Sequence, residues 1–179
     1  SALYAAVNVA YSIRLKRIPL LDVSLIATGF VLRLYAGSFA GGIPLSEWIV
    51  VLTFLLALFL ALAKRRDDLV IHQQTGDHVR VASKGYNLPM INSAITLLAA
   101  AVILAYLQYT LSPEVKARLG SDHLYLTTLF VVLGILRYLQ ITFVEEDSGS
   151  PTRILLRDRF TQANLLCWFA AFGWILYSA

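Results

Sequence analysis

Apolar residues of this chain gather in long stretches that are separated by short polar loops. Leu88–Thr110 and Phe160–Ala179 contain no charged residue at all. A helix needs roughly 20 predominantly apolar residues to cross about 30 Å of hydrocarbon. The pattern therefore predicts five membrane-spanning helices, near residues 22–41, 45–64, 88–110, 123–144 and 160–178.

A shorter apolar stretch, Ala2–Ala10, precedes these five and is too short to cross a bilayer. It also lacks the charged start and the cleavage site of a signal peptide. The chain begins at Ser1, and we expect it to be the C-terminal portion of a longer protein, cut within an earlier helix. The predicted fold is all-α: residues 1–179 form a single integral membrane domain, a multi-pass transmembrane helical bundle with a truncated first helix.

The composition supports a membrane protein over a soluble one. Hydrophobic residues make up 58% and charged residues 15% of the chain, with a mean hydropathy of +0.68. Soluble domains have about 45–50% apolar and about 25% charged residues. The net charge of +4 would suggest nucleic acid in a soluble chain, but here it has a topological explanation. The single cysteine, Cys167, cannot form an internal disulfide and fits a small packing residue.

Basic residues concentrate in alternate loops, which predicts the orientation of the chain. The two basic residues of the opposite loops are Lys116 and Arg118. The positive-inside rule places the basic loops in the cytoplasm of a cell whose inner membrane holds the protein. These loops contain Arg14, Lys16, Arg17, Lys64, Arg65, Arg66, Arg80, Lys84, Arg153, Arg157 and Arg159.

The densest polar cluster, Lys64-Arg65-Arg66-Asp67-Asp68, follows an apolar run on the predicted cytoplasmic side. Two carboxylates can help to hold Mg²⁺, which commonly shares oxygen ligands with substrate phosphates. The three cations can bind phosphate oxygens. Two ordinary interpretations compete: an ion pair between Lys64 and Asp68, four residues apart, and a charge run that ends a membrane helix.

Asp22 and Arg33 are ionisable groups on one predicted helix. Asp22 falls at the helix start, where it either caps the helix or contributes to a site. Arg33 lies three turns further along nearly the same face, at a depth where a charge is costly unless it meets a partner or a wet cavity. A stripe of glycines flanks Arg33 and allows close helix packing, so we expect Arg33 to face inward. The stripe comprises Gly29, Gly37 and Gly41.

The remaining ionisable groups favour structural roles. Arg137 lies about two turns (~10 Å) from the cytoplasmic end of its span, within snorkelling distance. The loop 145–151 is typical of a turn with solvated acids. Asp158 opens the last helix, where it anchors the interface or faces the cytoplasmic mouth. The three histidines lack the paired spacing of metal ligands.

The order of these features resembles one family of membrane enzymes. The first loop reads Tyr11-Ser12-x-x-Leu15-Lys16-x-x-Pro19-x-x-Asp22, and Gly29-Phe30-Val31-Leu32-Arg33 follows in the next helix. The cluster after the second full span reads Lys64-Arg65-Arg66-Asp67-Asp68-Leu69. Together they resemble the UbiA prenyltransferase superfamily, and within it the decaprenyl-phosphate phosphoribosyltransferase branch. The resemblance covers essentially the whole chain.

The resemblance implies nine helices around a cavity that opens to the cytoplasm and the bilayer, with this chain covering the end of helix four through helix nine. Two acidic motifs face that cavity in the family. The first has no counterpart here and would lie before Ser1, so we expect the chain alone to be inactive. The second is often Asp-x-x-x-Asp, but here Asp68 is followed by His72 and Asp67 by Ile71. That departure suits the phosphoribosyl branch.

The resemblance further implies a magnesium-dependent transfer of 5-phosphoribose from phosphoribosyl pyrophosphate to a polyprenyl phosphate. Asp67 and Asp68 are the predicted catalytic and metal-binding residues. Asp22 and Arg33 are the predicted cavity wall. The candidate phosphate-binding residues are Arg14, Lys16, Lys64, Arg65 and Arg66.

Two other functions fit the same pattern. A prenyltransferase that moves an isoprenyl chain from its diphosphate to an aromatic acceptor would share the fold and the metal. A non-enzymatic transporter or scaffold would explain the helices and the intramembrane arginines Arg33 and Arg137. This alternative would assign no role to the adjacent carboxylates of Asp67 and Asp68.

Overall fold

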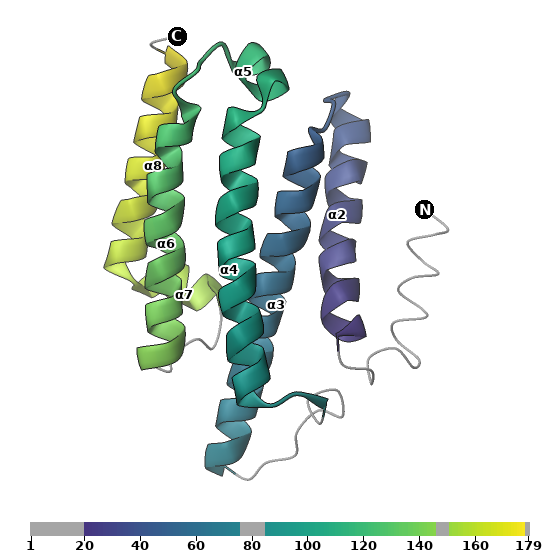
Figure 1. Ribbon diagram of the computed structural model, residues 1–179, viewed down its shortest axis with the longest axis vertical. Coiled ribbons are helices and arrows are strands. Elements are labelled where there is room, and N and C mark those ends of the chain that lie inside the picture. The colour runs from purple at the N-terminus through teal and green to yellow at the C-terminus, as the bar shows by residue number, and fades with distance from the viewer. Residues whose placement is uncertain (1–19, 76–84, 146–150, 178–179) are drawn as a thin grey trace. The chain divides into compact units, whose positions relative to one another are not determined.

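The computed structural model of the protein describes residues 20–75, 85–145 and 151–177 (Figure 1). All regular elements in these three ranges are helices, so the all-α prediction is confirmed. In chain order they are α2 (Leu21–Gly41), α3 (Glu47–Thr75), α4 (Leu88–Leu111), α5 (Pro113–Leu119), η3 (Leu124–Thr127), α6 (Thr128–Gln140), the π-helical turn η4 (Ile141–Glu145), α7 (Pro151–Arg157) and α8 (Arg159–Tyr177).

Four of the five predicted spans are confirmed as helices that are long and apolar enough to cross a membrane. They are Leu21–Gly41, Glu47–Ile71, Leu88–Leu111 and Leu124–Glu145.

The fifth predicted span forms α8, a helix of 19 residues at the expected place. The polar side chains of Gln162 and Asn164 in its first turns lower its mean hydropathy, and a crossing by α8 stays a prediction. The stretch Ala2–Ala10 lies outside the described residues.

The end of α3 differs from the prediction. We expected a span over 45–64, with the charged cluster just beyond it, but the helix continues to Thr75. Arg, Asp and Leu at the next positions do not break a helix, and neither Gly nor Pro follows before Thr75. The charged cluster is therefore helical, which fixes the direction of each of its side chains.

The described residues divide into two compact units. The first unit comprises the residues up to 45 together with 53–98. The second unit comprises 46–52 and the residues from 99 onward. In the first unit Val23, Phe59, Ile91 and Ile95 are buried. The single domain expected for residues 1–179 stays a prediction.

The ends of α2 show two residues with positive φ. Gly42, with φ +63°, follows the helix, and its N–H donates to the carbonyl of Ser38. This left-handed conformation suits glycine. Leu20, directly before the helix, has φ +68°, which is uncommon for a residue with a branched side chain. The start of α2 therefore needs contacts that hold Leu20 in place.

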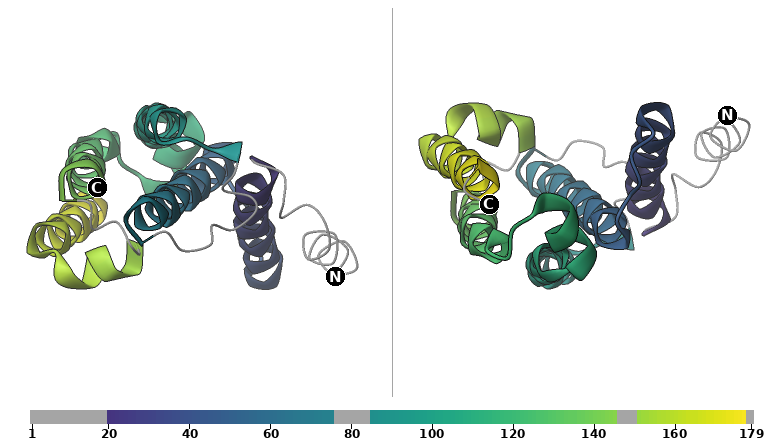
Figure 2. Two further views of the ribbon diagram at one scale, coloured as in Figure 1. Left: turned by 90° about the horizontal axis from the view of Figure 1, so that it is seen from below. Right: turned by 90° about the horizontal axis from the view of Figure 1, so that it is seen from above.

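In the second unit α6 packs against α8, and the two lie side by side in Figures 1 and 2. Asn164 of α8 donates its Nδ2 to the carbonyl oxygen of Phe130 at 2.8 Å. A Cβ on Gly134 would lie 3.2 Å from that same nitrogen. The absence of a side chain at Gly134 thus permits the polar contact between the two helices.

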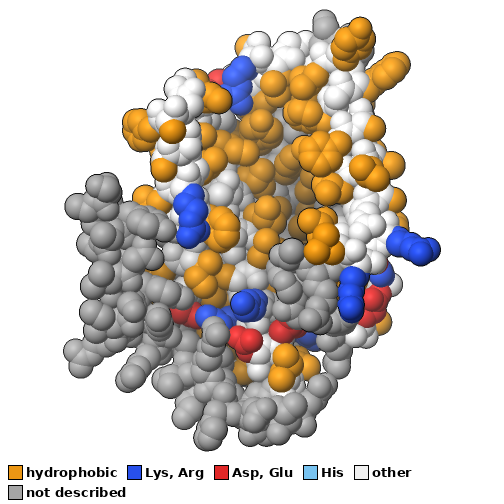
Figure 3. All heavy atoms as spheres, turned by 180° about the vertical axis from the view of Figure 1, so that it is seen from behind, with side chains coloured by type: hydrophobic (Ala, Val, Ile, Leu, Met, Phe, Trp, Pro, Cys, Tyr) orange, Lys and Arg blue, Asp and Glu red, His pale blue; other side chains and the backbone are white. Residues whose placement is uncertain are grey.

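The exterior of the helices carries many large apolar side chains. Between 11% and 33% of each span is buried within the chain, and Leu97, Leu104 and Trp174 are each more than half exposed. Figure 3 shows many hydrophobic side chains on the described part of one face. Exposed large apolar side chains in such number mark contact with lipid or with other helices. Together with the four spans, they identify a membrane protein.

Candidate functional site

The charged cluster on α3 is divided by the geometry of the helix. Successive residues of an α-helix point about 100° apart, whereas residues three or four apart share a face. Arg65 and Asp68 accordingly lie together, and the Nη1 of Arg65 contacts Oδ2 of Asp68 at 3.0 Å. Asp67 lies on another side of the helix and is buried, while the side chain of Asp68 is 32% exposed.

Asp22 of α2 binds the same arginine. The Nε of Arg65 donates to Oδ2 of Asp22 at 2.7 Å, and both residues are buried. The N-cap residue of α2 is Leu20, which forms no side-chain cap, and Asp22 lies in the first turn, where the helix dipole favours a carboxylate. Asp22 pairs with Arg65 across two helices. The pair is also a tertiary contact between residues that are 43 positions apart.

Tyr86, just before α4, completes this group. Its hydroxyl donates to Oδ1 of Asp22 at 3.1 Å and accepts the backbone N–H of Leu20 at 2.6 Å. Burial raises the pKa of the Tyr86 hydroxyl, and the neighbouring Asp22 carboxylate raises it further. The hydroxyl therefore stays protonated and serves as the donor. Both oxygens of Asp22 are thus engaged.

Arg66 points to a different partner, on α4. Its Nε donates to Oδ1 of Asn92 at 2.9 Å, and Arg66 is buried. Two neighbouring arginines thereby connect α3 to two different helices. Direct phosphate contact by Arg65 and Arg66 stays a prediction, and these contacts give each of them a structural role as well.

The carboxylates of this unit fit one part of a magnesium site. Mg²⁺ retains several waters and is commonly held by one or two carboxylates together with substrate phosphates. Asp68 offers a partly exposed carboxylate with one oxygen outside its contact to Arg65. Asp67 points elsewhere and both oxygens of Asp22 are occupied. No group of three or more metal-ligating side chains occurs among the described residues. Asp68 therefore fits a single ligand of the predicted ion.

Lys64 and Arg33 are exposed. Asp68 pairs with Arg65 rather than with Lys64, so the ion pair considered for Lys64 is wrong. The guanidinium of Arg33 lies 5.3 Å from the centroid of the Phe30 ring on its own helix, a cation–π geometry. A place for Arg33 in a cavity wall stays a prediction. The predicted phosphate-binding residues Arg14 and Lys16 lie outside the described residues.

The glycine stripe of α2 does not produce close packing within the described part of the chain. A Cβ on Gly29 or Gly37 would meet no atom within 4 Å, and one on Gly41 would meet only Ile43 at 3.6 Å. The expected tight helix contact at this stripe is thus not made by the described residues.

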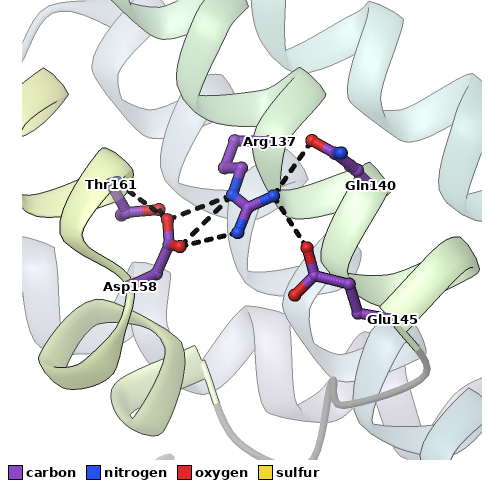
Figure 4. A network of polar contacts seen from close by, with 5 residues as sticks. All are labelled: Arg137, Gln140, Glu145, Asp158 and Thr161. Atoms are coloured by element: carbon purple, nitrogen blue, oxygen red, sulfur yellow. Dashed lines mark hydrogen bonds and ion pairs between the residues drawn. The ribbon is translucent and has the colours of Figure 1, made fainter.

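Arg137 forms a second charged network, in the other unit (Figure 4). Its Nη2 lies 2.7 Å from Oδ1 of Asp158, and its Nη1 lies 2.7 Å from Oε1 of Glu145 and 3.0 Å from Oε1 of Gln140. Asp158 also accepts the backbone N–H and the hydroxyl of Thr161. The structural role expected for Arg137 is confirmed. Hydrogen bonds from Arg137 hold the pKa of Asp158 well below its ordinary value, and those from Thr161 act in the same direction.

Sequence reasoning did not identify Tyr86 or Asn92. Tyr86 contacts Asp22 from 64 positions away, and Asn92 contacts Arg66 from 26 positions away. The position of Tyr86 beside an apolar span is also typical of interface tyrosines, so its pattern gave no functional signal. Asn92 is one of a few polar residues near the start of an uncharged span, and that was the available signal for it.

Several of the known proteins that are similar to this chain share one name. No family model matches the chain. A decaprenyl-phosphate phosphoribosyltransferase of Mycolicibacterium smegmatis is 30% identical over 98% of this chain and 57% of the relative. Proteins of the same name from Corynebacterium glutamicum and Mycobacterium tuberculosis are each 28% identical, over 92% and 95% of this chain and 49% and 55% of the relatives. The chain thus spans about half the length of the curated relatives it matches. The resemblance to the decaprenyl-phosphate phosphoribosyltransferase branch that the sequence indicated is therefore confirmed over nearly the whole chain.

Proposed function

We propose that the protein to which this chain belongs transfers 5-phosphoribose from phosphoribosyl pyrophosphate to a polyprenyl phosphate of the decaprenyl type. The similarity to proteins of that name over 92–98% of the chain carries the proposal. The reaction takes place at the cytoplasmic face of the cell membrane, in a magnesium-dependent transferase. Its partners are the lipid phosphate, the phosphoribosyl donor and the bilayer.

The chemistry is a displacement at the anomeric carbon of the donor. An oxygen of the lipid phosphate forms a bond to this carbon, and the bond from the carbon to the pyrophosphate oxygen breaks. Pyrophosphate leaves with the electron pair, so no oxidant or reductant is needed. Positive charge near the departing pyrophosphate stabilises the transition state. A magnesium ion supplies part of this charge when it is bound.

The contacts of the charged residues on α3 indicate a different role for each of them. Asp68, partly exposed, would hold the magnesium that accompanies the diphosphate, and the exposed ammonium of Lys64 would bind a phosphate oxygen. Arg65 is engaged by two carboxylates, and its main part is to fix Asp68 in position. Asp67 is buried on another side of the helix, which makes it the weaker candidate for the metal.

Label transfer tests this function directly. Membranes containing the complete gene product are given magnesium, a polyprenyl phosphate and phosphoribosyl pyrophosphate labelled in the ribose. We expect label in the lipid extract, and its loss when a chelator removes magnesium. Absence of lipid label with folded protein and intact substrates would refute the proposal. Transfer of an isoprenyl chain from a labelled diphosphate to an aromatic acceptor would then support the prenyltransferase alternative.

The role of Asp68 has its own test in the same assay. Substitution Asp68→Asn keeps the shape but removes a metal ligand, and we expect the rate to fall about 100-fold or more. Asp122→Asn is the matched control, because the Asp122 side chain is 81% exposed and lies outside the cluster. Full activity of Asp68→Asn would remove Asp68 from the site.

A further inference from the structure

Tyr86 is not one of the predicted site residues, yet its hydroxyl contacts Asp22, and Asp22 pairs with the Arg65 that binds Asp68. The hydroxyl donates to Oδ1 of Asp22 at 3.1 Å, and the other oxygen of Asp22 accepts from Arg65 at 2.7 Å. Arg65 in turn reaches Asp68 at 3.0 Å. A continuous series of hydrogen bonds thus leads from the segment before α4, through the start of α2, to the partly exposed carboxylate on α3.

The same hydroxyl also fixes the backbone at the start of α2. Leu20 has φ +68°, a strained conformation for a residue with a Cβ, which persists when surrounding contacts enforce it. The Leu20 N–H donates to the Tyr86 hydroxyl at 2.6 Å. Since Asp22 lies two residues later, this bond and the bond to Oδ1 together determine where the Asp22 carboxylate lies.

Burial makes this arrangement specific to the hydroxyl. Tyr86 is 7% exposed and Asp22 is 1% exposed, so water cannot readily replace a lost donor. Without the hydroxyl, Oδ1 of Asp22 would lose its donor from Tyr86, and the Leu20 N–H would lose its acceptor there. The Asp22 carboxylate would then be held through Oδ2 alone, and the direction of the Arg65 guanidinium that it binds would be less tightly fixed.

We propose that Tyr86 is a positioning residue for the phosphoribosyl donor: through Asp22 and Arg65, its hydroxyl sets the orientation in which Asp68 meets the metal–diphosphate of the donor. The inference rests on the proposed function, because it assigns Asp68 to that substrate. Tyr86 itself contacts neither the donor nor the lipid. Its effect is therefore on the binding of one substrate, the phosphoribosyl pyrophosphate, and on the magnesium that accompanies it.

The substitution Tyr86→Phe isolates the hydroxyl, because the ring and its packing remain. Residues that orient metal ligands typically contribute about 10- to 100-fold to metal affinity or activity. We expect the KM for phosphoribosyl pyrophosphate and the magnesium concentration for half-maximal rate to rise about 10-fold. The KM for the polyprenyl phosphate should change less than about twofold. A residue that only stabilised the fold would lower the unfolding temperature and leave these constants unchanged.

The measurements use the complete gene product in detergent or membranes. Initial rates are taken while each substrate and magnesium are varied in turn, and equilibrium binding of magnesium with phosphoribosyl pyrophosphate is measured without the lipid. Tyr109→Phe is the matched control: it removes a tyrosine hydroxyl that makes no hydrogen bond to the described residues. We expect this control to behave as the unaltered protein in both measurements.

Asp22→Asn provides a second variant that keeps the side-chain shape and one acceptor oxygen. It weakens the hold on Arg65, and we expect the same donor-specific rise in KM and the same loss of donor binding. If Tyr86→Phe does not fold, this variant decides the question.

Unchanged donor and magnesium constants in the variants, or a rise confined to the lipid KM, would overturn the role of Tyr86. Failure of the proposed function is a separate result, since the unaltered protein would then give no lipid label.

Discussion

Tyr106 lies within α4, and its hydroxyl contacts side chains from two other elements. Its oxygen lies 2.8 Å from Oγ1 of Thr127 and accepts a hydrogen bond from Nε1 of Trp168 at 2.9 Å. Thr127 donates its own proton to the carbonyl of Leu124 at 2.6 Å, so Tyr106 is the donor to Thr127. Each hydroxyl proton and the indole N–H thereby has an acceptor within the second unit.

Removal of this hydroxyl should destabilise the protein. Tyr106→Phe leaves the indole N–H of Trp168 and an oxygen of Thr127 without their partner, and we expect a loss of about 1–2 kcal/mol in the free energy of unfolding. Chemical unfolding of the detergent-solubilised protein measures it. Tyr109→Phe, as control, should stay within about 0.5 kcal/mol. Equal effects of the two variants would contradict the assigned role of the Tyr106 hydroxyl.

At the scale of elements, the junction of α7 and α8 depends on one carboxylate. Asp158 directly precedes α8 and accepts the N–H of Thr161 at 2.8 Å, the contact of an N-terminal cap. It also binds Arg137 of α6. The Asp158 side chain therefore gives a hydrogen-bond acceptor to an otherwise unpaired N–H in the first turn of α8, and it links α8 to α6.

This double role predicts a dependence of stability on pH. The Arg137 contacts lower the pKa of Asp158 from 3.8, the value for the unfolded chain. A carboxyl with a lowered folded pKa stabilises the protein fully above its unfolded pKa, and this contribution is lost as pH falls further. We expect the unfolding temperature to drop as pH is lowered from about 5 to about 3.

The variant Asp158→Asn checks this assignment by thermal unfolding across the same pH range. It should be less stable than the unaltered protein at neutral pH and should lose part of the decline below pH about 4. Asp122→Asn, at an exposed position, should keep the full decline. An unchanged profile for Asp158→Asn would place the acid sensitivity elsewhere.

The contact between α6 and α8 predicts different outcomes for alanine substitution at two glycines. Alanine is favoured over glycine within a helix by about 0.5–1 kcal/mol. At Gly173 a Cβ meets nothing within 4 Å, so Gly173→Ala should stabilise the protein. At Gly134 the Cβ would crowd the amide of Asn164, and Gly134→Ala should be less stable than Gly173→Ala by about 1 kcal/mol. Unfolding curves in detergent compare the two, and equal stabilities would refute the close contact.

At the scale of the whole molecule, the orientation in the membrane stays a prediction from the basic residues. Gln73 follows the span Glu47–Ile71 and Asp122 follows the span Leu88–Leu111, so a single crossing separates them. In a Cys167→Ser background, Asp122→Cys should react with a membrane-impermeant maleimide on intact spheroplasts. Gln73→Cys should react only after the membrane is opened. The reverse pattern would invert the proposed topology and move the candidate site out of the cytoplasm.

Parts of the candidate site could be read from the sequence and others could not. The cluster at 64–68 was found because five consecutive charges beside an apolar run are conspicuous. The split between its members was not foreseen, since we expected Asp67 and Asp68 to act together beyond the helix end. The helix continues instead, and its rotation turns the two carboxylates apart. Asp22 was identified as a candidate, but its partners Arg65 and Tyr86 follow from contacts between distant segments.

The sequence by itself determined the helical class and the four confirmed spans, because backbone groups in lipid must be satisfied within a helix and about 20 apolar residues are needed to cross. It also determined the family resemblance, through short motifs. Only the tertiary structure decided which charges are neutralised: Arg65 by Asp22 and Asp68, and Arg137 by Asp158 and Glu145. An ion pair between helices depends on the rotation and approach of each helix, and those follow from packing between residues far apart in the chain.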